Sequence, residues 1–169
     1  MIEFKTIRYK NFLSSGNQFT EINFQESNTA LIVGTNGAGK STILDALTFS
    51  LFGKPFRKVN KAQLVNSTNE RDCKVEIEFD AKGIPYKIVR GIKPNVFKVY
   101  RNGKQMNEDA SANDQQKMLE GSILRLNYKS FTQVVILGSA SFIPFMQLSA
   151  ANKRGDRRPP RYQSLFFYV

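Results

Sequence analysis

Residues 29–42 read Thr-Ala-Leu-Ile-Val-Gly-Thr-Asn-Gly-Ala-Gly-Lys-Ser-Thr. They contain the phosphate-binding loop pattern G-x-x-x-x-G-K-[ST], whose fixed positions are Gly34, Gly39, Lys40 and Ser41. The apolar run 30–33 before the loop predicts a buried strand, and the apolar residues of 43–52 recur at helical spacing. Because the motif requires strand, loop and helix in this order, the stretch predicts an α/β protein of the P-loop NTPase class.

The loop has the residue types that phosphate binding needs. Its glycines allow the backbone to wrap around an anion, so that main-chain N–H groups point at phosphate oxygens, and the helix that follows adds the positive end of its dipole. Lys40 is expected to reach the β and γ phosphates, the Ser41 hydroxyl to bind Mg²⁺, and Thr42 to meet the α phosphate. The residues predicted to bind a purine nucleotide here are Gly34, Thr35, Asn36, Gly37, Ala38, Gly39, Lys40, Ser41 and Thr42. A chance match within an ordinary strand-to-helix turn is the alternative.

The bulk composition excludes several classes of protein. The 169 residues suffice for one domain with a buried core, and no apolar run approaches the roughly 20 residues of a membrane span. The N-terminus lacks the layout of a signal peptide, so we expect a cytoplasmic protein with no membrane partner. Cys73 is the only cysteine and there is no histidine, which excludes an intrachain disulfide, histidine-based nucleophilic catalysis and the usual zinc sites.

The charge balance favours a polyanionic partner. The net charge is +11, from 25 Lys and Arg against 14 Asp and Glu, and nucleic acid is the usual partner of such a surface. A merely solvated basic surface is the alternative. Residues 54–72 are polar and basic, and are predicted as an exposed connector with a short helical turn near 62–65 and as a candidate surface facing nucleic acid.

The remaining pattern predicts an antiparallel sheet and one capped helix. Alternating apolar and polar residues predict a pair of strands before the loop, at 2–9 and 19–24, and a meander with one solvated face at 74–80, 84–90 and 96–100. Gly53 is predicted to end the helix that follows the loop, and Asn102-Gly103 to form a tight hairpin-type turn. Ser111 is predicted to cap a further helix, with Asp114 in its first turn. The apolar run 134–137 is predicted as a buried strand or segment.

Five segments outside the loop carry a more specific resemblance: 9–12, 49–56, 63–69, 93–97 and 131–138, with 144–146 beyond them. With the loop, they resemble the N-terminal lobe of the SMC-like ATPases of double-strand-break processing, the SbcC family, and its phage members most. The resemblance covers residues 1 to about 150. It implies the N-terminal half of an ABC/SMC-type ATPase head, with an antiparallel β meander and with ATP and Mg²⁺ as cofactors.

The resemblance also implies a larger assembly. In that family ATP lies between two heads, and head closure regulates a partner nuclease and DNA binding. The expected partners are DNA, a nuclease subunit, the C-terminal lobe of the same head and a second head. The Walker B acids and the signature motif lie in that C-terminal lobe, so no catalytic residue is assigned in this chain, and alone it is expected to hydrolyse little ATP. A non-enzymatic basic module, whose loop grips nucleic-acid phosphate, is the alternative function.

Two positions depart from the family pattern, and the end of the chain departs altogether. Leu13 stands where the family often has an arginine near the nucleotide, so that contact is not transferred. Ser139 stands at the place of the Q-loop glutamine and is predicted to hold the metal through its hydroxyl or a water; a mere small-residue turn over 138–141 is the alternative. Residues 151–169 predict an irregular basic tail. It is either a native arm that binds nucleic acid or the product of a reading-frame shift near residues 153–155.

Overall fold

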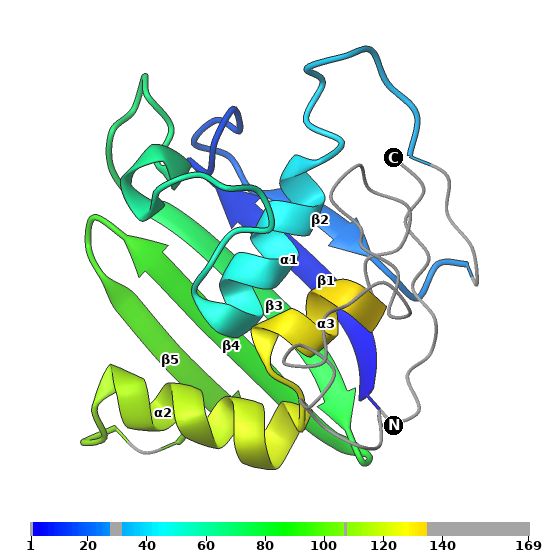
Figure 1. Ribbon diagram of the computed structural model, residues 1–169, viewed down its shortest axis with the longest axis vertical. Helices are drawn as coiled ribbons and strands as arrows, with labels where there is room; N and C mark the ends of the chain where they lie inside the picture. Colours follow the sequence, from blue (N-terminus) through cyan, green and yellow to red (C-terminus); the bar gives the residue numbers. More distant parts are fainter. Residues whose placement is uncertain (1, 28–31, 107, 135–169) are drawn as a thin grey trace, which may run out of the picture.

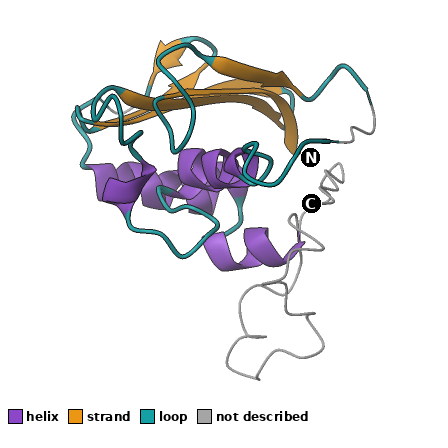
Figure 2. Ribbon diagram, turned by 90° about the horizontal axis from the view of Figure 1, so that it is seen from above, coloured by secondary structure: helices purple, strands orange, loops and turns teal. Residues whose placement is uncertain are grey.

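An antiparallel sheet packs against a layer of helices on one of its faces (Figures 1 and 2). The computed structural model describes residues 2–27, 32–106 and 108–134. Its elements are β1 (Ile2–Lys10), β2 (Thr20–Asn23), α1 (Thr42–Phe52), the 3-10 helix η1 (Lys61–Leu64), β3 (Cys73–Ala81), β4 (Ile84–Ile92), β5 (Val96–Arg101), β6 (Lys104–Gln105), α2 (Ala112–Met118), the π-helical segment η2 (Leu119–Leu124) and α3 (Tyr128–Val134).

The sheet has six strands in the order β2-β1-β3-β4-β5-β6, and every neighbouring pair is antiparallel. The predicted strand pair before the loop and the predicted meander are both confirmed. The structure adds β6, which pairs with β5 through a tight turn at Asn102 and Gly103. Both turn residues have positive φ angles, 50° and 76°, as a two-residue hairpin turn of this kind requires.

The core lies between the sheet and α1. Alternate side chains of β1 and β3 point to this side, among them Ile7, Tyr9, Ile77 and Phe79, and all four are buried. The opposite side chains of the same strands form ion pairs such as Lys5–Asp80 on the other face. This alternation is the period-2 pattern that the sequence predicted for a sheet with one solvated face.

Helix α1 is buried along its whole length, from its first residue to the last of its 11. It packs on β1, β3 and β4 from one side and on α3 from the other (Figure 1). It ends at Gly53, whose φ of 69° is left-handed and whose N–H donates to the Phe49 carbonyl. This is the glycine cap that the sequence predicted.

Helix α2 begins at the predicted cap. The Ser111 hydroxyl accepts a hydrogen bond from the Asp114 N–H at the start of α2. The helix continues as η2, whose buried residues Leu119 and Leu124 join the core. It ends at Arg125, which has a left-handed φ of 54°.

Three local predictions need correction. In the expected strand 30–33, residues 30 and 31 lie outside the described part; Ile32 and Val33 are not in a strand, and Val33 is 81% exposed. A strand forms only where another strand pairs with it, and the described sheet offers this segment no neighbour. The expected strand at 134–137 is also wrong at its start, because Val134 ends helix α3; residues 135–137 lie outside the described part.

The connector 54–72 is less exposed than predicted. It does contain the expected helical turn, η1, but Leu64 is wholly buried and Val65 is 8% exposed. An isolated antiparallel bridge joins Phe12 to Val65. The connector is therefore tied to the segment after β1, and this tie shapes the site.

Candidate nucleotide-binding site

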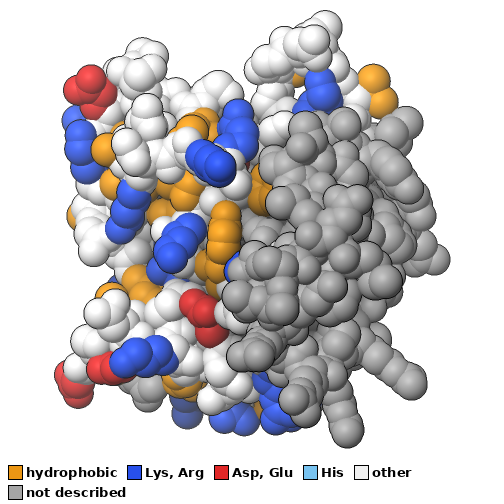
Figure 3. All heavy atoms as spheres, viewed as in Figure 1, with side chains coloured by type: hydrophobic (Ala, Val, Ile, Leu, Met, Phe, Trp, Pro, Cys, Tyr) orange, Lys and Arg blue, Asp and Glu red, His pale blue; other side chains and the backbone are white. Residues whose placement is uncertain are grey.

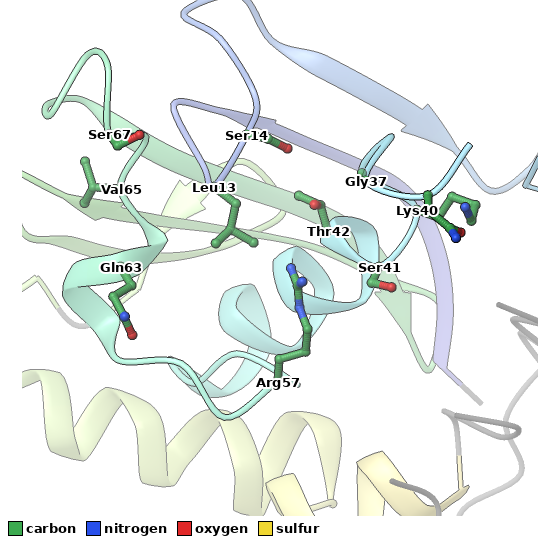
Figure 4. Close-up of a pocket in the computed structure, with 12 residues that line it drawn as sticks. Leu13, Ser14, Gly37, Lys40, Ser41, Thr42, Arg57, Gln63, Val65 and Ser67 are labelled. Carbon is green, nitrogen blue, oxygen red and sulfur yellow. The ribbon is translucent and has the colours of Figure 1, made fainter. Parts of the chain in front are cut away.

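A pocket of about 600 Å³ opens beside the N-terminus of α1 (Figure 4). This volume lies in the range of small-molecule sites. The glycine-rich loop and the first turn of α1 form one side, through Asn36, Gly37, Gly39, Lys40, Ser41 and Thr42. The segment after β1 and the connector form the other side, through Leu13, Ser14, Arg57, Gln63, Val65 and Ser67.

The backbone of the loop is shaped for an anion. Gly37 and Gly39 have φ angles of 87° and 90°, which L-residues with side chains rarely adopt. A Cβ at Gly34 would lie 3.2 Å from the Ala38 Cβ, so the loop also closes tightly on itself. Among the described residues, Ala38 and Thr42 donate their N–H groups inside this turn, to the carbonyls of Thr35 and Gly39. No main-chain carbonyl of the described residues accepts the N–H groups of Gly37, Gly39 and Lys40, which can therefore bind phosphate oxygens.

Lys40 lies folded onto the loop. Its Nζ donates to the Gly34 carbonyl at 2.8 Å and to the Thr35 carbonyl at 3.0 Å. Two neutral carbonyls are weaker partners for an ammonium group than a phosphate is. The position therefore suits a lysine that exchanges these carbonyls for a phosphate when a nucleotide binds.

Ser41 and Thr42 begin α1 and face the same pocket. In the described part of the chain, the Ser41 hydroxyl makes no capping hydrogen bond at the start of α1, so it is available to a ligand. No group of three or more acidic, cysteine or histidine side chains that could bind a metal occurs among the described residues. The Ser41 hydroxyl could hold Mg²⁺ together with phosphate oxygens and water, which is how this ion usually binds beside phosphates.

An ion pair with one buried partner lies beside α1. Asp45 is 0% exposed, and the Nη2 of Arg57 lies 2.6 Å from its Oδ2. The sequence gives only one signal for this pair, which is the acidic residue Asp45 in the otherwise almost apolar stretch that forms α1. A fully buried carboxylate needs a partner.

The far wall is apolar at its centre. The Leu13 side chain points into the pocket between Val65 and Thr42 (Figure 4). The Leu13 N–H donates to the Leu64 carbonyl at 2.7 Å, which holds the two segments of this wall together. In the sequence, Leu13 stands out only as a departure from the family, and no pattern marks Ser14, Gln63, Val65 and Ser67 as pocket residues.

The structure thus brings most of the predicted nucleotide-binding residues to one pocket. Six of them line it, while Gly34 and Thr35 hold Lys40 and Ala38 packs on Gly34. Ser139 lies outside the described residues, and so does the tail 151–169. No helix in the described part is long and apolar enough to cross a membrane.

A glycine-rich loop between the sheet and a buried helix, with its lysine and serine at one pocket, defines a P-loop nucleotide-binding protein. The chain belongs to the AAA domain family, which it matches over residues 6–160. The predicted class of fold is thereby confirmed.

Curated relatives extend this finding. The chain is 47% identical over 150 residues to exonuclease subunit 2 of Enterobacteria phage T4 and, equally, to that of Escherichia phage RB69. It is 33% identical over 139 residues to a probable DNA double-strand break repair Rad50 ATPase of Aquifex aeolicus. These matches cover 88%, 88% and 79% of the chain, but 26%, 26% and 14% of the relatives. The predicted resemblance is confirmed, and the chain spans about a quarter of the length of the phage relatives.

Solved structures show the same fold. A structure described under ATP-driven dimerization and DNA-stimulated activation of SMC ATPases superposes with a TM-score of 0.60 at 22% identity, covering 90% of this chain and 95% of that one. An Smc head domain bound to the C-terminal winged-helix domain of ScpA superposes with a TM-score of 0.55 over 79% of this chain and 44% of that one. The N-terminal part of an SMC-type ATPase head is therefore the fold of this chain.

Proposed function

We propose that this chain is the ATP-binding N-terminal part of an ATPase subunit of a DNA double-strand-break repair and recombination exonuclease. The observation that carries the proposal is the pocket in which Gly37, Gly39, Lys40 and Ser41 converge at the start of α1. The phage and Rad50 relatives support the choice of ATP and DNA among the possible ligands.

In this proposal the chain binds and orients the nucleotide. The free N–H groups of the loop hold the β and γ phosphates, and Lys40 turns from the Gly34 and Thr35 carbonyls to the same oxygens. The Ser41 hydroxyl holds Mg²⁺, which neutralises charge on the phosphates. We assign no group of this chain to water activation, so hydrolysis belongs to a complete head.

The remaining partners follow from the same proposal. We propose that a C-terminal lobe pairs with the segment around Val33, whose 81% exposure leaves apolar surface to be covered. We further propose that two complete heads dimerise around ATP and that their closure regulates a nuclease subunit on DNA. Because the substrate is DNA of a phage or its host, the compartment that we propose is the host cytoplasm.

A second function, a non-enzymatic module that grips nucleic acid through the loop, draws on the net charge of +11. Two observations weaken it. On the outer face of the sheet, ion pairs engage several cations, among them Lys5 with Asp80 and Arg8 with Glu76. On the face that carries α1, Lys and Arg side chains lie at several separate places (Figure 3).

Substitution of Lys40 by Ala separates the two functions. ATP binding, measured by titration calorimetry, should fall at least tenfold because a charge-assisted phosphate contact is lost, whereas DNA binding should stay within about twofold. Lys98→Ala, on the exposed part of β5, is the matched control and should change neither. Unchanged ATP affinity with a fall in DNA affinity would instead establish the second function.

A further inference from the structure

A buried network of asparagine side chains lies directly behind the far wall of the pocket. Asn11 is 1% exposed and Asn66 is 9% exposed. The Asn69 Nδ2 donates to the Asn11 Oδ1 at 2.7 Å, and the Asn66 main-chain N–H donates to the Asn11 carbonyl at 2.9 Å. The network therefore fastens the end of β1 to the connector across more than 50 residues of sequence.

Asn66 uses both ends of its amide. Its Nδ2 donates to the main-chain carbonyls of Leu13, at 3.0 Å, and Ser15, at 3.1 Å. Its Oδ1 accepts the N–H groups of Thr68, at 2.9 Å, and Asn69, at 3.0 Å. One side chain thus fixes the segment 13–15 through its donors and its own turn, 67–69, through its acceptor.

The donor half holds a backbone conformation that Leu13 would not adopt by itself. Leu13 has a φ of 53°, in the left-handed region that costs a branched side chain of this size free energy. Hydrogen bonds grip it on both sides: its N–H donates to the Leu64 carbonyl, and its carbonyl accepts from Asn66. In this conformation the Leu13 side chain points into the pocket (Figure 4).

The wall that results suits a nucleoside better than a phosphate. Its centre is made by the apolar side chains of Leu13 and Val65, and its rim carries the uncharged polar groups of Gln63 and Ser67. Arg57, the cation among its lining residues, is paired with Asp45. A base has apolar faces and polar edges, and a ribose has hydroxyls. The glycine-rich loop on the opposite side of the pocket accounts for the phosphates.

We propose that Asn66 is a positioning residue for the nucleoside end of the bound nucleotide: it holds Leu13 in its left-handed conformation, so that Leu13 and Val65 form the surface against which the base and ribose pack. This inference rests on the proposed function, because it presumes that the loop binds the triphosphate of a nucleotide. It adds a residue that contacts no ligand itself and acts through Leu13.

The test compares Asn66→Asp with the unaltered chain on two ligands, ATP and inorganic tripolyphosphate. Aspartate keeps the acceptor half of the side chain but cannot donate to the Leu13 and Ser15 carbonyls. ATP affinity should fall on the order of tenfold, since the Leu13 wall loses its support. Tripolyphosphate affinity should stay within about twofold, because that ligand reaches only the loop. Leu13→Ala should give the same selective loss.

A structural readout needs no ligand. In hydrogen exchange, the Leu13 amide of the Asn66→Asp variant should exchange faster than in the unaltered chain. The amides of Thr68 and Asn69 donate to the Oδ1 that the variant retains, so they should keep their exchange rates. The control is Asn127→Asp, where the side-chain oxygen likewise accepts a main-chain N–H, that of Ser130, away from the pocket. It should change neither affinity nor the Leu13 exchange rate.

The other outcomes are distinct. An equal loss of affinity for ATP and tripolyphosphate in the Asn66→Asp variant would overturn the inference, because Asn66 would then support the fold or the loop as a whole. Unchanged ATP affinity would overturn it as well. If the unaltered chain bound neither ligand, the proposed function would fail and the inference with it.

Discussion

Asp45 and Arg57 form a three-point contact between α1 and the connector. The Arg57 main-chain N–H donates to the Asp45 Oδ1 at 2.9 Å, and the Arg57 Nε and Nη2 each lie 2.6 Å from the Asp45 Oδ2. The Asp45 side chain is wholly buried, whereas that of Arg57 is 47% exposed. The pair thus couples the first turn of the phosphate-binding helix to the wall of the pocket.

This asymmetry predicts unequal effects when either partner is replaced. Arg57→Met should lower the free energy of unfolding by about 2–4 kcal/mol, because it leaves a buried carboxylate without its cation. Asp45→Asn should cost less, about 1–2 kcal/mol, since it removes the charge together with the ion pair. Urea unfolding at neutral pH without nucleotide measures both. The assignment would be wrong if Asp45→Asn proved the more damaging change.

Gly39 should not tolerate a side chain. Its φ of 90° strains any L-residue, although a Cβ there would meet nothing closer than the Thr42 Oγ1 at 3.7 Å. Gly39→Ala should therefore cost about 1–2 kcal/mol through backbone strain alone, and ATP affinity should fall as the neighbouring N–H groups move. Thermal unfolding and calorimetry measure the two effects. Gly16→Ala, where the space is open and φ is not positive, is the control and should be nearly neutral.

Arg90 holds the C-terminal end of α1, the helix that also contains Asp45. Its Nε donates to the Ser50 carbonyl at 2.7 Å, it also bonds Gln116, and its guanidinium carbon lies 3.6 Å from the centre of the Phe97 ring. Burial lowers the Arg90 pKa to about 9, so the group is charged at neutral pH.

Replacing Arg90 by Met should lower the free energy of unfolding by about 2–4 kcal/mol. The methionine fills part of the volume but leaves the Ser50 carbonyl in the last turn of α1 without this donor. Arg101→Met, at an exposed position of β5, should change stability by less than about 0.5 kcal/mol. Equal effects in the two variants, measured by denaturant unfolding, would contradict the assigned role.

Glu76 should make the fold sensitive to acid. Burial on its own raises the pKa of Glu76, but hydrogen bonds from Arg8 and Lys87 outweigh it, and the pKa is lowered from its usual 4.5. A carboxylate with a lowered folded pKa adds stability above its unfolded pKa, and this part is lost as the pH falls through the folded value.

The fall in stability below about pH 4.5 should therefore be shallower in Glu76→Gln than in the unaltered chain. At neutral pH the same variant should be less stable, because the ion pairs with Arg8 and Lys87 are gone. Denaturant unfolding across pH 2–7 measures both effects. Glu26→Gln, at an exposed position after β2, is the control and should leave the profile unchanged. An equally steep fall in Glu76→Gln would exclude Glu76 as its source.

The sequence predicted those parts of the fold whose signals are local. The turn at Asn102 and Gly103, the cap at Ser111 and the end of α1 at Gly53 each depend on a few adjacent residues. The alternation in β3 and β4 was sufficient for the meander. The glycine-rich loop was evident for the same reason, since its whole pattern lies within the eight residues 34–41.

The features that were missed or wrong depend on contacts between distant segments. Asn66 meets Leu13 across 53 residues, and Asp45 meets Arg57 across a helix end, so no periodicity marks either pair. The strand predicted at 30–33 is not formed at Ile32 and Val33, its described residues, for a related reason. An apolar run indicates that a segment can pair in a sheet, but only a neighbouring strand makes it do so.

The pairing of β1 with β3 has a consequence for the order in which the protein folds. Strands β3 to β6 are joined by short turns and can form early, whereas β1 meets β3 only after the chain from residue 11 to residue 72 has closed into a loop. That loop contains both walls of the nucleotide pocket. A nucleotide therefore finds its site only in a late state of folding, and its binding should slow unfolding while leaving the rate of folding almost unchanged.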